Sequence, residues 1–408
     1  MRLVAVTCVR NEIDIIEAFA RHTLALVDHL VVLDNGSRDG TGDVLRALAK
    51  EGLPLEIVED PSPGHYQWQR MTSLMREWAV GRYGADWVVA LDGDEFLVVQ
   101  EEPLIPEEAA TDRPISLLWR TYVPDACDDD AELNPVLRIR RRRTADTWEF
   151  VKVMVPKTLA ALPNAHLAQG NHELFVDGQH CESRSQNRGY LAHFPLRSPG
   201  QYAEKIVINS LQLQAMAKRG QGWGYHYKDH FELLKQNEHA LDENLSEAAQ
   251  RYAAPAEAPI ELGTVVDPIA YRGGPLRYTP RADDATRAWR ALLDYAEDLA
   301  RQHAVLTAGL TEDQRRSVQQ QAAVVADLYA QLEQRQKDST ALTSSINTQL
   351  EEQQKERAAI ESQLAELRQS RTWRIGRLFV GPIAWARRSR QRYSQALTHK
   401  LKLLRSRP

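Results

Sequence analysis

Strand-like and helix-like segments alternate through the first hundred residues, and this alternation leaves few folds open to the chain. Apolar runs rich in β-branched residues cover 3–9, 30–33, 55–58 and 87–91. Between them, apolar residues recur at helical spacing over about 15–26, 42–49 and 68–82. Strands separated by helices of this length form right-handed β–α–β crossovers in a parallel sheet. The sequence therefore predicts an α/β domain built on a Rossmann-like sheet.

Beyond residue 97 the pattern changes to strands without long helices between them. The segments 115–123, 136–139 and 150–155 are typical of strands, which predicts an antiparallel extension and so a mixed sheet. A helix is predicted over 199–217, and the Pro- and Gly-rich stretch 253–280 is predicted to be irregular. We therefore expect a first domain over 1–255, then a linker and helical extension over 256–310.

The last hundred residues predict a coiled coil followed by a basic tail. Over 311–370, one register of alternating four- and three-residue steps has apolar residues at ten of its fifteen positions, from Val318 to Leu367. The residues on either side of this register are polar, so the register is the one apolar face of the helix and an isolated helix would expose it. Self-association is therefore favoured over a helix that folds back on the first domain. The segment 371–408 holds eleven Lys or Arg and no Asp or Glu, with Trp373 and Trp385 interleaved. This pattern favours peripheral contact with an anionic membrane over nucleic-acid binding, because no nucleic-acid-binding signature accompanies it.

Cysteine usage and hydropathy bear on the compartment. Cys8, Cys127 and Cys181 lack the short spacing of a zinc site or redox pair, which predicts free thiols in a reducing environment. We find no secretory signal and no apolar run of about 18 residues or more. The expected location is therefore cytoplasmic, with possible peripheral attachment to the inner membrane.

Acidic and polar residues follow three of the predicted strands. The motif LDGDEF (91–96) comes at the end of the fourth strand, DNGSRDGT (34–41) follows the second, and Asn11-Glu12 follows the first. The carboxyl ends of parallel strands meet at one edge of a sheet, where ligands bind. Two carboxylates one residue apart, Asp92 and Asp94, suit Mn²⁺ or Mg²⁺. Either loop alone could be an ordinary turn, but together they predict one metal and nucleotide site.

The order and spacing of several motifs identify a resemblance. The segments VRNEIDIIEAFARHTLALVDHLVVLDNGSRDGT, ADWVVALDGDEFL, GNHEL and LAHFPLRSPGQYAEK resemble family 2 glycosyltransferases of the GT-A fold. The similarity is to a bacterial branch with a DxDEF motif and a later H-[YF]-P-x-R-S segment, and it covers roughly residues 1–240. It implies a metal-dependent transferase that moves a sugar from a nucleotide-diphosphate-sugar donor to a glycan or lipid-linked acceptor. The implied setting is cell-surface polysaccharide synthesis of the O-antigen or capsule type.

The resemblance also implies roles for individual residues. It places Asp92 and Asp94 on the metal and ribose, with His193 as third metal ligand and His172 as its competitor. The residues that it implies at the donor nucleotide or diphosphate are Asn11, Glu12, Asp34, Asp39, Arg70, Arg197 and Lys205.

The implied chemistry is inverting, with a carboxylate that deprotonates the acceptor hydroxyl. Glu173 is the first candidate for this base, and Asp177, Glu149 and Glu95 remain open. A competing interpretation is a degenerate transferase that acts as a coiled-coil scaffold in a polysaccharide assembly complex. A nucleotidyltransferase is disfavoured, because Val9-Arg10-Asn11 is not a Gly-rich basic loop.

Overall fold

The computed structural model describes residues 1–62, 64–107, 109, 111–144, 149–215, 225–237, 245–254, 262–281 and 284–308. The predicted coiled coil over 311–370 and the basic tail over 371–408 lie outside the described residues. All the elements discussed below belong to the unit Met1–Leu306, apart from the last residues of the final helix.

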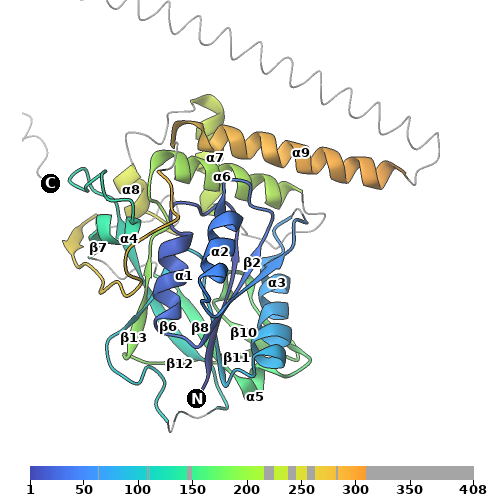
Figure 1. Ribbon diagram of the computed structural model, residues 1–408, viewed down its shortest axis with the longest axis vertical. Helices are drawn as coiled ribbons and strands as arrows, with labels where there is room; N and C mark the ends of the chain where they lie inside the picture. Colours follow the sequence, from blue (N-terminus) through green and yellow to red (C-terminus); the bar gives the residue numbers. More distant parts are fainter. Residues whose placement is uncertain are drawn as a thin grey trace, which may run out of the picture. The chain divides into compact units, whose positions relative to one another are not determined.

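A mixed sheet forms the centre of this unit (Figure 1). Its parallel part runs in the order β4 (Trp87–Ala90), β1 (Leu3–Val9), β2 (His29–Asp34) and β3 (Leu55–Glu59). Next to β4, β8 (Val151–Pro156) runs antiparallel to both β4 and β6 (Ile115–Val123). The predicted parallel sheet with an antiparallel extension is therefore confirmed, and so is the position of each of these strands.

Further strands extend the sheet beyond β6, and one of them pairs with the strand that directly follows the acidic motif Asp92-Gly93-Asp94. The strand β13 (Gly189–His193) pairs with β5 (Glu95–Val99) antiparallel and with β6 parallel, which brings His193 beside the residues after β4. The remaining strands are β7 (Arg141–Arg143), β14 (Thr264–Val266) and β12 (Arg184–Ser185), and a separate small sheet holds β9 (Ala165–Leu167), β10 (Leu174–Val176) and β11 (Gln179–Cys181).

The two faces of the sheet are covered by different helices, because alternate residues of a strand point to opposite faces. Ala5 and Val32 pack in one core with α1 (Ile16–Leu24) and α2 (Thr41–Lys50). Their neighbours Val6 and Val31 pack in a second core with α3 (Gln67–Ser73) and the π-helical turn Leu74–Arg82 that continues it. Side chains buried this fully each stabilise the fold by about 1.5–3 kcal/mol, so both layers hold the loops at the strand ends in place.

Two helices lie beyond the carboxyl ends of the parallel strands. Helix α6 (Pro199–Gln214) begins after Ser198, whose hydroxyl accepts from the backbone N–H of Gln201, and it confirms most of the helix predicted over 199–217. Helix α9 (Arg287–Ala308) packs on α6 through Ala291 and Tyr295 (Figure 1). The other helices are α4 (Pro135–Arg138), α5 (Lys157–Ala160), α7 (Tyr225–Gln236) and α8 (Leu245–Gln250), with short 3-10 turns at Gln169–Asn171 and Asp284–Thr286.

One local prediction is wrong. The segment 136–139, predicted as a strand, lies mostly in helix α4, because Asn134 caps the backbone N–H of Val136 and Pro135 favours the first helical position. Asn11 lies before α1 in a left-handed conformation with φ 55°. The three cysteines are free thiols, as predicted. Within the described ranges, none of the helices has the length and hydropathy needed to span a membrane.

Candidate active site

A cavity of about 290 Å³ opens at the carboxyl ends of β1, β2 and β4. Its walls include the residues after β1 (Arg10, Asn11 and Glu12) and the Asp92-Gly93-Asp94 motif after β4. Of the other predicted site residues, Arg70, His193 and Lys205 also line the cavity, whereas Asp34, Asp39, Glu173 and Arg197 are not in its lining. The structure thus brings together seven of the eleven residues that sequence and resemblance had selected.

Asp92 is held at the cavity wall by three side chains. Its Oδ1 accepts from Gln67 Nε2 at 2.8 Å and from Asn171 Nδ2 at 3.4 Å. Its Oδ2 lies 2.7 Å from Nζ of Lys152, a fully buried lysine that also reaches Glu95 Oε1 at 3.1 Å. A buried charge without a partner costs several kcal/mol, so Lys152 has to keep its two contacts. These contacts hold the side chains of Asp92 and Glu95 in place. Lys152 was missed in the sequence, although a lysine in the middle of the apolar strand VKVMVP was a signal for it.

Asp94 lies deeper and faces two cations and a histidine. Lys205 Nζ is 2.6 Å from its Oδ2, and His193 Nε2 is 3.7 Å from its Oδ1. Burial alone would raise the pKa of Asp94, but the positive charges of Lys205 and Arg197 hold it below its usual range. Burial lowers the pKa of His193, so the ring is neutral at pH 7. Asp94 is therefore an ionised carboxylate next to a neutral imidazole.

The residues present fit a divalent cation. Carboxylate oxygen and neutral imidazole nitrogen are ligands that Mn²⁺ accepts. Asp92, Asp94 and His193 line the same cavity, and the buried Nδ1 of His193 has no hydrogen-bond partner among the described residues. Within that part of the chain, no three His, Cys, Asp or Glu are already grouped as a metal cage. The two lysines instead neutralise the carboxylates in the structure, so a cation would have to share or displace their contacts.

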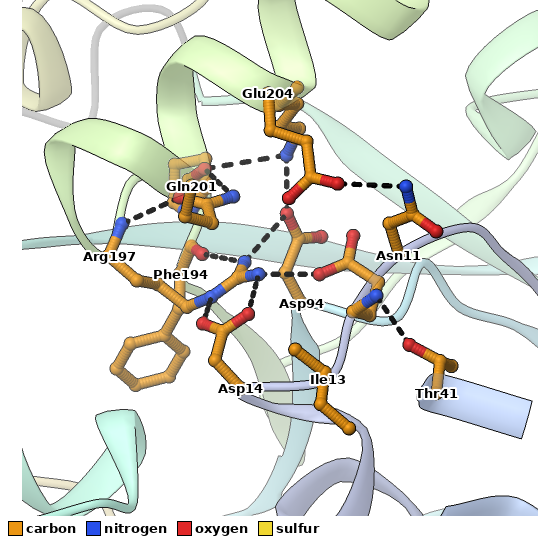
Figure 2. A network of polar contacts seen from close by, with 12 residues as sticks. Asn11, Ile13, Asp14, Thr41, Asp94, Phe194, Arg197, Gln201 and Glu204 are labelled. Atoms are coloured by element: carbon orange, nitrogen blue, oxygen red, sulfur yellow. Dashed lines mark hydrogen bonds and ion pairs between the residues drawn. The ribbon is translucent and has the colours of Figure 1, made fainter. Parts of the chain in front are cut away.

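The loop after β1 is tied to the helices above the cavity (Figure 2). Asn11 donates from Nδ2 to Glu204 Oε1 at 2.8 Å and accepts at Oδ1 from the backbone N–H of Arg38. The backbone N–H of Glu12 donates to Thr41 Oγ1 at 2.8 Å. Burial raises the pKa of Glu12 to about 7, although the charge of Arg197 opposes the rise. Asn11 and Glu12 are thus placed at the cavity by contacts from both α2 and α6.

The turn over 34–41 shapes the cavity edge chiefly through its backbone. Asp34 accepts at Oδ1 from the backbone N–H of Ser37, and Gly36 and Gly40 have φ of 72° and 106°, as a tight turn requires. Both oxygens of Asp39 are engaged, with the backbone N–H groups of Ile13 and Thr41 and with the Thr41 hydroxyl. In the structure these two aspartates brace the loops on either side, and contact with a nucleotide stays a prediction.

Two arginines expected at the donor phosphates have protein partners instead. Arg70 donates from Nε to Asp60 at 2.7 Å and from its other nitrogens to Ser62 and to the carbonyl of Gly64, which fastens the loop after β3. Arg197 has a fully buried side chain whose guanidinium bridges Glu12 and Asp14 and donates to the carbonyl of Phe194 (Figure 2). The sequence did not reveal these partners, because the acids of Arg197 come from a distant segment and Asp60 reaches Arg70 only through the fold of the loop between them.

Glu173, predicted as the base, lies outside the cavity lining. Its side chain is 50% exposed, and Nε2 of His180 lies 3.7 Å from its Oε1. Its neighbour His172 does line the cavity. The chain turns at Gly170, whose φ of 77° sends successive side chains in different directions. The predicted segment is thus at the site, but a different residue of it faces the cavity.

Comparisons with known proteins add little. No family model matches the chain, and a search of curated proteins found no match. Among solved structures, it is similar to a mannosyltransferase from Pyrobaculum calidifontis in complex with GDP-Man and Mn²⁺, at 15% identity and a TM-score of 0.32 over 63% of this chain and 76% of that one. It is also similar to glucosyl-3-phosphoglycerate synthase from Mycobacterium tuberculosis in complex with Mg²⁺ and UDP, at 22% identity and a TM-score of 0.20.

That second match covers 29% of this chain and only 43% of the synthase. A putative glucose-1-phosphate thymidylyltransferase from Bacillus anthracis gives 11% identity and a TM-score of 0.28 over 54% of this chain and 98% of that one. TM-scores this low assign no activity, so the function has to be argued from the site.

Proposed function

We propose that this protein is a metal-dependent glycosyltransferase that takes a sugar from a nucleotide-diphosphate-sugar donor. The observation that carries the proposal is the convergence of Asp92, Asp94 and His193 in one cavity at the carboxyl ends of parallel strands, with Lys205 beside them. This is where α/β sheets bind ligands, and the donor set suits a hard divalent cation.

The chain's own residues would then divide the work. Asp92, Asp94 and His193 would hold Mn²⁺ or Mg²⁺, which supplies Lewis-acid stabilisation of the departing diphosphate. Lys205 Nζ, now on Asp94, is positioned to meet an anionic oxygen in the cavity. Asn11 and Glu12 line the side of the cavity assigned to the nucleoside, and Asp34 braces the neighbouring turn. Lys152 holds Asp92 in a single orientation, so the carboxylate needs little reorganisation when the donor binds.

The proposal also covers the acceptor, which would be a glycan or lipid-linked sugar in cell-surface polysaccharide synthesis. The transfer would invert the configuration at the anomeric carbon. This assignment rests on the sequence resemblance. The setting fits a coiled coil over 311–370 that joins copies of the chain or a partner, and a basic tail over 371–408 that touches the inner membrane.

Donor turnover tests the activity. We expect purified full-length protein with Mn²⁺ to release nucleoside diphosphate from one of UDP-, GDP- or TDP-sugars, through transfer or slow hydrolysis, and to stop when EDTA is added. The measurement is a coupled assay for each free diphosphate. The assay should use enough protein for even slow release to exceed its detection limit for diphosphate. If none of the donors then releases diphosphate, the proposed activity is contradicted.

Removal of the tail tests the location. We expect a chain that ends at Gln369 to move from the membrane fraction to the supernatant when lysed cells are centrifuged, because about 1 kcal/mol of attraction to anionic lipid is lost for each basic residue. Unchanged partitioning would refute the tail as an anchor and would leave the catalytic proposal as it stands.

A further inference from the structure

Transfer with inversion needs a group that takes the proton of the attacking hydroxyl, and the cavity carboxylates are already paired. Among the described residues, the carboxylates in the lining are Glu12, Asp92, Asp94 and Glu204. Their cationic partners are Arg197, Lys152, Lys205 and Arg287 respectively. An acceptor hydroxyl would have to compete with these cations for the carboxylate oxygens. The proton acceptor is therefore better sought among the neutral groups of the cavity, an argument that rests on the proposed function.

His172 has its tautomer set by the backbone. Its Nδ1 lies 2.7 Å from the carbonyl oxygen of Val151. A carbonyl oxygen can only accept a hydrogen bond, so Nδ1 carries the proton. In the neutral ring, Nε2 then keeps its lone pair. Burial lowers the pKa of His172 to about 4, with the charge of Lys152 acting in the same direction and that of Asp92 opposing it, so the ring is neutral at pH 7.

The free nitrogen has space beside it because of Gly170. A Cβ built on Gly170 would lie 2.4 Å from Nε2 of His172, so any side chain at this position would block the nitrogen. His172 is partly exposed and lines the cavity together with Gly170. No hydrogen-bond partner for Nε2 is found in the part of the chain that the structure describes. The nitrogen can therefore accept a hydrogen bond from a ligand in the cavity.

Aromatic contacts fix the ring next to the metal-binding side chains. Trp119 lies with its ring centroid 5.3 Å from His172 and 4.2 Å from His193, so one indole contacts both histidines. Phe150 also contacts His172, at 5.0 Å, and packs on Trp119 at 5.6 Å. The residue before His172, Asn171, donates to Asp92. His172 is thus held in one orientation, and Trp119 and Asn171 connect it to His193 and Asp92.

We propose that His172 is the catalytic base, and that its Nε2 takes the proton of a sugar hydroxyl of the acceptor. The hydroxyl oxygen bonds to the anomeric carbon of the donor as the bond from that carbon to the diphosphate oxygen breaks. The bonding pair leaves with the diphosphate, and the proton moves to Nε2 and then to water. Charges balance, since a neutral imidazole becomes an imidazolium as the diphosphate gains one negative charge. Glu173, its exposed neighbour, has no role in this step.

The test compares His172→Gln with the matched control Glu173→Gln in the full chain. Loss of a general base costs about 10²–10⁴-fold in rate. We therefore expect kcat for diphosphate release to fall by about that factor in His172→Gln, with the dissociation constant of UDP or GDP unchanged within about threefold. Glu173→Gln should keep the wild-type kcat. A kcat of His172→Gln near that of an active wild type, or a loss confined to Glu173→Gln, would overturn the assignment and leave the transferase proposal intact.

A second variant separates a chemical role from packing. In His172→Ala, added imidazole should restore part of kcat in proportion to its neutral fraction, because a free base can occupy the space left by the ring. Merely structural damage would not respond to imidazole. Absence of rescue in a folded His172→Ala protein that still binds nucleotide would argue against proton transfer at this position.

Discussion

Arg197→Met is expected to destabilise the first unit by about 3–5 kcal/mol, the usual cost of breaking a buried ion pair from one side. The guanidinium is fully buried, with Nε 2.6 Å from Asp14 Oδ2 and a second nitrogen on Glu12. Without it, Glu12 loses its cation and Asp14 keeps only Arg287, at 3.1 Å. At about 2–4 °C for each kcal/mol, the melting temperature should fall by roughly 6–20 °C.

Arg46→Met serves as the control for Arg197→Met. Arg46 is half exposed and pairs with Asp43 and Glu59 at the surface, where ion pairs contribute about 0–1 kcal/mol. Differential scanning calorimetry should separate the two variants clearly. If Arg197→Met melted like the wild type but no longer bound nucleoside diphosphate, Arg197 would be a phosphate ligand, as the sequence resemblance implies.

The ion pair between Arg197 and Asp14 also predicts how the stability of the fold depends on pH. Burial opposes ionisation of Asp14, but the charges of Arg197 and Arg287 outweigh it and hold the pKa of Asp14 well below its usual range. A carboxyl with a lowered folded-state pKa stabilises the fold above its unfolded pKa of about 3.9. That contribution is lost as pH falls further, so the wild type should lose this stability below about pH 4. At pH 7, Arg197→Met should keep only the part of this stability that Arg287 supplies.

Asp94→Asn is expected to lower kcat by about 10³-fold or more while the protein stays folded. Asparagine keeps the size of the side chain and an oxygen that can accept from Lys205, but it removes the charge that would hold the cation. Loss of several kcal/mol of charge stabilisation in the transition state corresponds to this factor. The readouts are diphosphate release and far-UV circular dichroism.

Asp177→Asn is the matched control for Asp94→Asn. The exposed side chain of Asp177 accepts a hydrogen bond from Asn164. Its backbone has a left-handed φ of 52°, which asparagine tolerates. It was also one of the open candidates for the base, so unchanged turnover in this variant would remove it from that set. Wild-type turnover in Asp94→Asn would contradict the metal assignment.

Much of the fold could be predicted because it depends on local patterns. The apolar run of β1 and the spacing of Ile16 and Phe19 in α1 each report burial on one face, and both elements were found where expected. The segment 136–139 was misread, because a short apolar run does not distinguish a strand from a turn of helix. There the Asn134-Pro135 cap decided the structure.

The site was harder to predict, because contacts between distant segments decide what each charged group does. Asp92 and Asp94 could be selected from their position after a strand. The sequence could not show that Lys152 lies under Asp92, that Asp60 engages Arg70, or that His172 rather than Glu173 faces the cavity. Each of these facts depends on strand register or on the turn at Gly170.

Calorimetric titration of the full chain with UDP, GDP and TDP, each with Mn²⁺ and with EDTA, tests the proposed site. The account predicts that one nucleotide binds only when Mn²⁺ is present, and that Asp94→Asn abolishes this binding. A ligand at 100 times its dissociation constant should also raise the free energy of unfolding by about 2.7 kcal/mol, which a melting curve would detect. If no nucleotide binds under either condition, or if one binds equally well in EDTA, the metal-dependent donor site is contradicted. Failure of all three nucleotides to bind would favour the scaffold interpretation.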